Sequence, residues 1–577
     1  MKELIDAAMK RTPCDLLFKG GRVPNLFTME YEEINVAVKN GVIVGMGSGY
    51  EATEIIECAG KALVPGFIEG HMHVESTNMV PRNLAAVLSP LGTTTVMPDP
   101  HEIANTCGME GVRFMERESR DLPIDFYYGA PSCVPATSYE TPREPLDAKD
   151  IKTLLDEGTC AHLGEMMNFP GVINCDENTL AKLEASKGKV ITGHAPGVIG
   201  EELSAYIIAG PSSDHECFMA EGALEKLRRG MYVMIRQGFT ARNLSTLAPL
   251  VKDNPYVCTR CMAVSDDLAP EFIAERGHLN GCMKELMVEG IRPLAALRMV
   301  TLTPAEYFGL GDRGAIAPGR IADIVMLDSV EECNVLKVWK RGKLVAENGS
   351  LVEPITPPVI SKKLPGVGVM PKMPSPDDLK VKAPAGDAMM NVIGTVSEQV
   401  LTRTLTMEPT VSEGYVVADA ARGIAKMAVV EKNQGTGRTA IGFIKGFGLV
   451  KGAIASSVAH DAHNFSCVGM DDVSMSTAFA ALAKIGGGLV VALGDEVLAE
   501  VEYPVGGLMS VRPIDEILKE SEKLKAAREE LGCTNGSAFM QLAFMSLSVI
   551  PELKLTDQGY FDILNVVVND LFLLLLL

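Results

Sequence analysis

The stretch Pro65-Gly66-Phe67-Ile68-Glu69-Gly70-His71-Met72-His73 decides how the fold of this chain is interpreted. It leads from a short apolar run into two histidines that are separated by one residue. In an extended segment, residues two apart project to the same side, so both imidazoles can reach one metal ion. A lone His-x-His pair is a weak signal, because a histidine after a strand is more often a hydrogen-bonded loop residue. The rest of the chain has to decide between the two interpretations.

Similar strand-like runs recur along the chain, and nearly all of them precede a stretch with helical apolar spacing. We count eight, at Leu63–Ile68, Thr93–Met97, Ile124–Tyr128, Thr159–Leu163, Lys189–Thr192, Gly210–Ser213, Met231–Ile235 and Tyr256–Val264. Eight alternating units over about 250 residues are the number and size of a TIM-like (β/α)8 barrel. An open, doubly wound parallel sheet is the alternative architecture.

Side chains that can bind a metal ion follow these runs. They are His71 and His73 after the first, His101 and Glu102 after the second, Glu165 after the fourth, His194 after the fifth, His215 after the sixth, and Asp266 and Asp267 after the eighth. A barrel gathers the carboxyl ends of its strands on one face. Five of the nine histidines therefore converge on one predicted face, which favours a metal site. Imidazole with carboxylate suits Zn, Mn or Fe, and the absence of cysteine from this set argues against a structural zinc site.

The segments on either side of the predicted barrel have a different sequence pattern, with short strand-like runs and turn residues. We expect residues 1–64 and 312–353 to pair into one small β-sandwich domain around a barrel at 65–311. Proline-rich residues 354–389 predict a linker, and residues 390–577 predict a C-terminal α+β domain. The expected fold class is therefore α/β: a (β/α)8 metal-dependent hydrolase barrel with two accessory domains.

Composition narrows the range of partners. The 577 residues include 74 acidic and 53 basic side chains, which gives a formal net charge of -21. This acidic surplus argues against binding to nucleic acid or to an anionic membrane. Thirteen scattered cysteines are typical of a reducing compartment, so we expect a cytoplasmic protein, and we expect a homo-oligomer. The apolar end at 571–577 is too short to cross a bilayer.

The stretch that ends in His73 resembles the first-strand signature of the amidohydrolase superfamily. Further motifs resemble the adenine deaminase family of bacterial and archaeal type, over residues 14 to 560 or so. These motifs lie at Asp99–Asn105, Pro131–Thr137, Gly164–Ile173, Gly193–Gly197, Ser213–Cys217, Gly230–Arg236, Ala455–Asn464 and Pro551–Asp557. Two positions depart from the family pattern: Glu69 stands where Asp is usual, and Leu268 stands where Arg is usual.

The resemblance implies a binuclear metal site. His71, His73 and Asp266 would hold one divalent ion, His194 and His215 the other, and Glu165 would bridge the two. Mn or Fe(II) is the implied metal, with Zn as an alternative. A hydroxide between the ions would convert adenine and water to hypoxanthine and ammonia, as a step of purine salvage. The competing functions are hydrolysis of an N6-substituted adenine or another cyclic amidine or amide, and a catalytically inactive scaffold, which the complete ligand set disfavours.

Proton transfer and substrate contacts need further groups. Asp266 is the expected proton shuttle to the leaving ammonia. Glu102 and His101 are candidates for protonating a ring nitrogen, the alternative being that they orient a metal ligand. Arg236 and Ser132 are candidate substrate contacts.

Some histidines and cysteines lie outside this predicted face. For His460 and His463 the sequence leaves three roles open: a lid over the pocket, another ion site, or structural hydrogen bonds. Packing roles are expected for His162 and His278, and for the Cys258–Cys261 pair.

Overall fold

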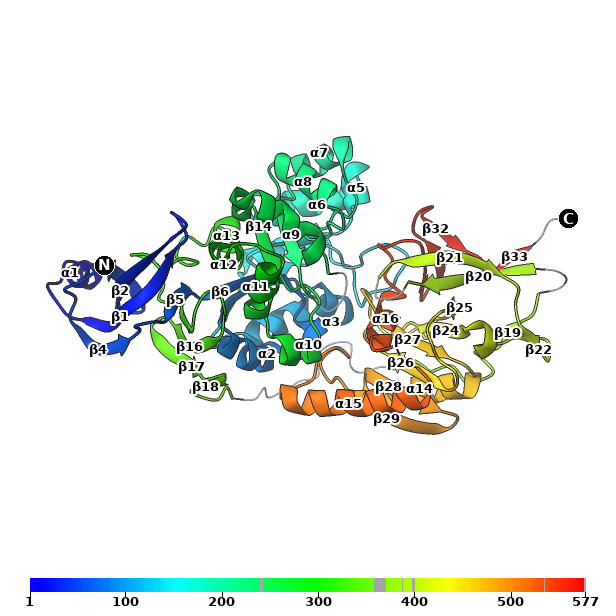
Figure 1. Ribbon diagram of the computed structural model, residues 1–577. Helices are drawn as coiled ribbons and strands as arrows, with labels where there is room; N and C mark the ends of the chain where they lie inside the picture. The colour runs from blue at the N-terminus through cyan, green and yellow to red at the C-terminus, as the bar shows by residue number, and fades with distance from the viewer. Residues whose placement is uncertain are drawn as a thin grey trace.

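The computed structural model describes residues 1–238, 242–356, 370–384, 386, 388–396, 400–533 and 535–574. Figure 1 shows three parts in a row: an N-terminal sheet at one end, a central part rich in helices, and a C-terminal part at the other end. Across the described residues, each helix is too short or too polar to span a bilayer.

The two flanks of the central part form one continuous sheet of nine strands. The strands before it are β1 (Cys14–Asn25), β2 (Glu30–Lys39), β3 (Val42–Met46), β4 (Ala52–Glu57) and β5 (Ala62–Pro65). The strands after it are β15 (Ile324–Leu327), β16 (Val335–Lys340), β17 (Lys343–Glu347) and β18 (Ser350–Leu351). Strand β15 runs antiparallel to β5, with Ile324 opposite Pro65. Segments some 250 residues apart in sequence therefore meet beside the central part.

The central part contains three short parallel ladders. They are formed by β6 (Phe67–Met72), β7 (Thr93–Pro98) and β8 (Asp125–Phe126); by β9 (Gly129–Ala130), β10 (His162–Met166) and β11 (Ile191–Gly193); and by β12 (Ser213–Asp214), β13 (Tyr232–Arg236) and β14 (Cys261–Val264). A parallel bridge between Met72 and Asp266 joins the end of the last ladder to the first strand. The carboxyl ends of these strands consequently lie near one another.

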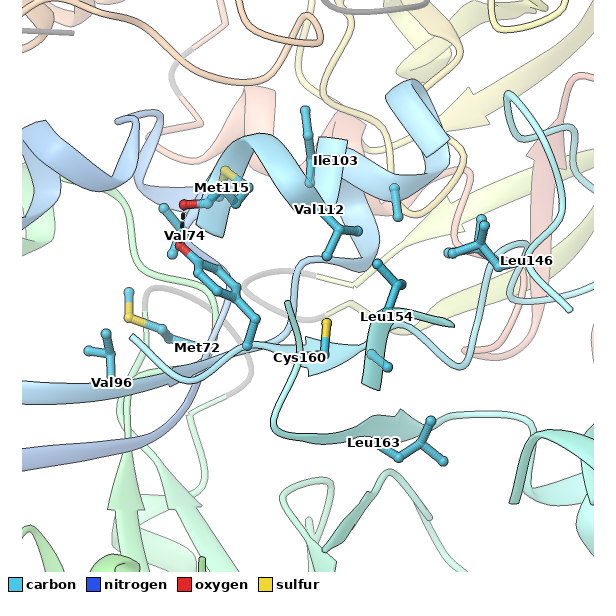
Figure 2. Packing of buried hydrophobic residues seen from close by; sticks show 14 of the residues in the cluster. Met72, Val74, Val96, Ile103, Val112, Met115, Leu146, Leu154, Cys160 and Leu163 are labelled. Carbon is cyan, nitrogen blue, oxygen red and sulfur yellow. Dashed lines mark hydrogen bonds between the residues drawn. The ribbon is translucent and has the colours of Figure 1, made fainter. Parts of the chain in front are cut away.

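Helices separate the central strands along the chain. They are α2 (Pro81–Leu88), α3 (His101–Glu118), α4 (Ala148–Asp156), α5 (Phe169–Ile173), α6 (Glu177–Ala185), α7 (Gly200–Ala209), α8 (Ala220–Arg228), α9 (Leu244–Asp253), α10 (Pro270–Arg276), α11 (Leu279–Val288), α12 (Pro293–Met299) and α13 (Leu302–Tyr307). Figure 2 shows side chains from these helices and strands, among them Val112, Leu154 and Leu163, gathered in one buried cluster. Burial of each such side chain contributes about 1.5–3 kcal/mol, and this packing holds the strand ends in place.

All eight predicted strands differ from the structure at one or both ends, and three of them show how. The first run divides at Gly66 into β5, which pairs with β15, and β6, which pairs with β7; a Cβ at Gly66 would collide with Thr94. The fourth strand begins at His162 rather than at Thr159. In the last run, Pro255–Thr259 forms a 3-10 helix, and only Cys261–Val264 is extended.

The C-terminal part is built on a second sheet of nine strands. These are β20 (Ala388–Thr395), β21 (Thr402–Met407), β24 (Ile424–Val430), β25 (Thr439–Lys445), β26 (Ala453–Ser456), β27 (Phe465–Gly469), β28 (Gly488–Leu493), β29 (Glu496–Glu502) and β33 (Phe572–Leu574). Helices α14 (Asp472–Ile485), α15 (Ile514–Glu530) and α16 (Ala538–Phe544) accompany it. The apolar end of the chain extends this sheet, since Phe572 lies opposite Met390. Residues 357–369 of the predicted linker lie outside the described part of the chain.

Polar contacts fasten the C-terminal part to the central part. The loop between β9 and α4 reaches toward it, and Asp557 accepts hydrogen bonds there from Thr141 N (3.1 Å) and Thr141 Oγ1 (2.7 Å). On the other side, Ser510 N donates to Asn78 O (2.8 Å), and Asn83 Nδ2 donates to Arg512 O (2.7 Å). The C-terminal part is thus held over the carboxyl ends of the central strands.

Candidate metal centre and substrate cavity

Glu165, in β10, lies between two pairs of histidines. Its Oε2 is 2.8 Å from His194 Nδ1 and 3.2 Å from His215 Nε2. Its Oε1 faces the other pair, 3.4 Å from His73 Nε2 and 3.9 Å from His71 Nε2. Burial alone would raise the pKa of the Glu165 carboxyl, but the facing His215 and His194 outweigh it and hold the pKa well below its usual value. One carboxylate therefore presents a separate oxygen atom to each pair.

Asp266 completes the cluster on the side of the first pair. Its Oδ1 is 3.1 Å from His73 Nε2 and 3.4 Å from His71 Nε2. Its Oδ2 accepts a hydrogen bond of 2.6 Å from Arg236 Nη1. Asp266 has a φ of 58°, in the left-handed region that costs an ordinary residue about 1–3 kcal/mol. Such strain is typical of functional positions.

The donor atoms of this cluster fit divalent metal ions. Ligand atoms of His71, His73 and Glu165 lie within 4.8 Å of one another, as do those of Glu165, His194 and His215. The Nε2 atom of His71 is buried and has no hydrogen-bond partner among the described residues. An orphaned buried nitrogen that faces two carboxylates is the expected sign of an ion ligand.

Neighbouring groups orient the candidate ligands. Asp99 O lies 3.1 Å from His73 Nδ1, so a proton on Nδ1 would leave Nε2 free to bind a metal. Asp99 Oδ2 also accepts a hydrogen bond from Glu165 N at 2.6 Å. Glu69 accepts hydrogen bonds from His71 N and Ser265 N, both at 3.0 Å, and thereby ties the first central strand to the last. The longer side chain at position 69, a departure from the family pattern, still reaches both strands.

The cluster forms one side of a small cavity of about 40 Å³. We call the side chains that the central part contributes the floor: His73, His101, Glu102, Glu165, Met167, His194, His215, Glu216, Arg236, Asp266 and Asp267. We call those of the C-terminal part the roof: Val400, His460, Asp461, Phe544, Leu547 and Ile550.

Glu102 lies at the junction of floor and roof. Its Oε1 is 3.2 Å from His460 Nδ1, and its Oε2 is 3.8 Å from His463 Nε2. The backbone N–H of Ala459 donates to His463 Nδ1 at 3.1 Å, so neutral His463 carries its proton on Nε2. A protonated Nε2 has no lone pair for a metal, and at 3.8 Å it is too far from Glu102 Oε2 for a hydrogen bond. The bond from Ala459 gives His463 a structural role, although ligand atoms of Glu102, His460 and His463 also lie within 4.8 Å of one another.

Not every residue singled out from the sequence lines the cavity. The hydroxyl of Ser132 donates to the carbonyl of Glu165, and Ser132 is absent from the cavity wall as described. His162 is buried against Phe308, and burial lowers its pKa to about 4. His278 lies 2.8 Å from Thr93 Oγ1 and 3.1 Å from Glu69 Oε2. Both cysteines of the Cys258–Cys261 pair are buried in an apolar cluster.

Sequence reasoning assigned no role to Asp99, Glu216 or Asp461. All three lie inside these motifs, within two residues of a residue that was singled out, so proximity in the chain was the available signal. The apolar roof residues Val400, Phe544, Leu547 and Ile550 carried no such signal, because they are far from the ligands in sequence.

Comparisons with known proteins agree with this architecture. Residues 62–345 match the amidohydrolase family, and residues 399–566 match the adenine deaminase C-terminal domain. The chain is 43% identical to adenine deaminase 2 of Carboxydothermus hydrogenoformans, over 98% of each protein. The chain belongs to the adenine deaminase family. It is also 41% identical to an adenine deaminase of Desulfatibacillum aliphaticivorans, over 97% of this chain and 98% of that protein. The resemblance inferred from the motifs is thereby confirmed.

Proposed function

We propose that this protein is an adenine deaminase, which hydrolyses adenine to hypoxanthine and ammonia. The observation that carries the proposal is the position of Glu165, whose two oxygens face separate histidine pairs at the floor of the cavity. Relatives named adenine deaminase that align over nearly the whole chain support the choice of substrate. In the same proposal, the strands from β6 to β14 form one (β/α)8 barrel in which β8 and β9 are two pieces of the third strand, and the bridge between Met72 and Asp266 supports its closure.

The floor would hold two divalent ions. We assign His71, His73 and Asp266 to one ion, His194 and His215 to the other, and Glu165 to both, with Mn or Fe(II) as the metal. When bound, the two ions supply a nucleophile at neutral pH by lowering the pKa of water. The protein's part is to hold the ligands rigidly, as the hydrogen bonds from Glu165 N and His71 N do.

Asp266 is placed to carry a proton to the leaving amine. Its Oδ2 is held by Arg236, whose guanidinium also pairs with Glu216. Arg236 thus keeps the Asp266 carboxylate in one orientation, which a proton shuttle requires. The Nε atom of Arg236 is buried, with no hydrogen-bond partner in the described part of the chain, and is the donor that remains for a substrate contact.

The side chains at the junction of floor and roof are placed to protonate a ring nitrogen of the base. Glu102 and His460 form a close pair of 3.2 Å, and both line the cavity beside His101. Two titratable groups so close share their proton as a unit. We therefore assign the ring-nitrogen proton to the Glu102–His460 pair, with His101 as its neighbour. For Ser132, the contact with the Glu165 carbonyl supports a positioning role in place of a substrate contact.

Turnover of purine bases tests the proposed function. The purified full-length chain is loaded with Mn or Fe(II), and adenine and N6-methyladenine are followed by ultraviolet absorbance. Conversion of adenine to hypoxanthine is expected. Preference for the methylated base would transfer the assignment to an N6-substituted adenine deaminase. If two ions are bound and neither base is converted, the deaminase proposal is wrong.

A further inference from the structure

A buried tyrosine behind the second histidine pair touches the ends of two neighbouring strands. Tyr206, on α7, is fully buried. Its hydroxyl accepts a hydrogen bond from His194 N at 3.0 Å and donates one to Met166 O at 2.7 Å. A phenol oxygen can accept and donate at the same time. One atom therefore joins the backbone of His194 to the residue that follows Glu165.

Strands β10 and β11 are irregularly paired just before this link. Leu163 lies opposite Ile191, whereas Met166 lies opposite Gly193, so β10 has one more residue than β11 over the same length. An extra residue of this kind disrupts the backbone ladder locally and bends the strand. The Tyr206 hydroxyl thus connects the two strands immediately beyond the irregularity. Glycine at position 193 leaves room for it, because a Cβ there would lie 3.0 Å from the Tyr206 oxygen.

The ligand atom of His194 is the one that depends most directly on the backbone. His194 faces Glu165 through Nδ1, at 2.8 Å. The other three imidazoles of the two pairs face the carboxylates through Nε2. The two ring nitrogens are distinct, since only Cβ and Cγ separate Nδ1 from the backbone. A small shift of the His194 backbone therefore moves its ligand atom, and rotation of the side chain can offset little of the movement.

Other anchors hold Glu165 without reaching His194. Glu165 N donates to Asp99 Oδ2, and Ser132 Oγ donates to Glu165 O. Lys182 Nζ in turn donates to Ser132 O at 2.8 Å. These bonds fix the backbone of Glu165 but not its distance from His194. Outside the two strands, Tyr206 is the described residue whose side chain bonds to both of their ends.

We propose that Tyr206 is a positioning residue that sets the spacing between Glu165 and His194 and thereby determines how tightly the second divalent ion is held. The inference rests on the proposed function, which assigns that ion to His194, His215 and Glu165. The two histidines and the aspartate assigned to the first ion follow other strands, so the hydroxyl should not influence their ion. Groups that orient a metal ligand in this way tune affinity without touching the metal.

The test is metal binding by Tyr206→Phe, which keeps the ring and removes one oxygen. Metal-free protein is titrated with Mn(II) alone, and the ions bound per chain are counted by equilibrium dialysis and metal analysis. We expect the first ion to bind as in the wild type and the affinity for the second to fall about 10- to 100-fold. At a Mn(II) concentration that saturates the wild type, kcat for adenine should be low and recover with excess Mn(II). KM should stay unchanged, because no substrate contact is lost.

Two further variants serve as comparisons. Tyr128→Phe removes another buried hydroxyl, which donates to Met115 O at 3.2 Å and lies 2.6 Å from Ser119 Oγ. This variant should bind both ions as the wild type does. Ser132→Ala releases the Glu165 carbonyl alone and should weaken both ions together, since both are assigned to Glu165. The thermal midpoint of each variant shows whether it is folded.

Two results would overturn the inference. One is a folded Tyr206→Phe protein that binds both ions with wild-type affinity. The other does not require that variant to fold: a Ser132→Ala protein that loses the second ion alone would show that an anchor of Glu165 by itself produces the effect. Failure of the proposed function is different, because the wild type would then bind two ions and leave adenine unconverted, while the metal titrations would keep their meaning.

Discussion

The floor and the roof of the cavity differ in chemistry and in origin. The floor consists mainly of imidazoles and carboxylates at the ends of central strands, from His73 to Asp267. The roof is mainly hydrocarbon and comes from loops and a helix more than 130 residues further along the chain. The difference shows that the reactive groups and the groups that enclose the substrate come from separate parts of the chain and meet different structural requirements. Reactive groups need rigid strand ends, whereas an enclosing wall needs only surface of the right shape.

Removing the carboxylate of Glu165 is expected to have the largest effect on metal binding and activity. We expect Glu165→Gln to lower activity more than about 1000-fold, because an amide cannot offer a charged oxygen to each histidine pair. Metal analysis should give fewer than two ions per chain. Glu184→Gln is the control, since Glu184 is an exposed side chain on α6. Near-normal activity with two bound ions would remove Glu165 from the centre of the floor.

The second prediction concerns Lys226, a buried lysine that supports two of the candidate ligands through hydrogen bonds to the residues beside them. Lys226 Nζ donates to Asp214 Oδ2 and to Ala195 O, both at 2.7 Å, and these residues adjoin His215 and His194. Lys226→Met leaves Asp214 buried without its partner, so we expect the protein to lose about 3–5 kcal/mol of stability. Metal affinity at the second histidine pair should fall about 10- to 100-fold.

The readouts are metal titration and the thermal midpoint. Lys187→Met, at an exposed lysine, should change neither. A Lys226→Met protein with wild-type metal affinity would show that metal binding does not depend on the hydrogen bonds of Lys226.

The third prediction separates roof from floor. Asp557 anchors the loop of the central part at Thr141, so Asp557→Ala should let the roof move away from the floor. We expect KM for adenine to rise about tenfold with a smaller change in kcat, because binding surface is lost while the reactive groups stay in place. Steady-state kinetics check the split, and Asp495→Ala in an exposed turn is the control. A fall confined to kcat would mean that the roof contributes to the chemistry.

The smallest effect is expected from a buried lysine behind the roof. Lys554 Nζ donates to Val400 O (2.7 Å) and Phe544 O (3.0 Å), and burial lowers the pKa of Lys554 to about 7. The unfolded chain binds this proton up to a pH of about 10.4, so the cost of burial is full below pH 7 and shrinks as the pH rises.

Thermal melts at several pH values check this linkage. Between pH 7 and pH 9, the thermal midpoint of the wild type should rise by a few degrees relative to the midpoint of Lys554→Met. Lys523→Met, on the exposed face of α15, should show no such trend. A difference that stays constant with pH would mean that Lys554 keeps its charge throughout.

Much of the floor could be predicted because its residues follow strand-like runs directly. His194 and His215 come immediately after β11 and β12, so the position of each strand end also places the ligand. The limits of the strands were harder to predict. At Gly66 the first run divides between β5 and β6, which pair with β15 and β7, and the local sequence does not reveal these partners. Ser132 was placed at the substrate from its motif alone, and only the fold shows its hydroxyl turned to the Glu165 backbone.

The sequence by itself determined the family, the alternation of strands and helices, and the set of imidazoles and carboxylates at strand ends. These are local properties, since periodicity and adjacency in the chain decide them. Only the tertiary structure decided that Asp461 and Phe544 close over Glu165, that Arg236 is shared between Glu216 and Asp266, and that the N-terminal sheet takes strands from both flanks. Those arrangements depend on contacts between residues far apart in the chain, whose packing energies no short stretch of sequence records.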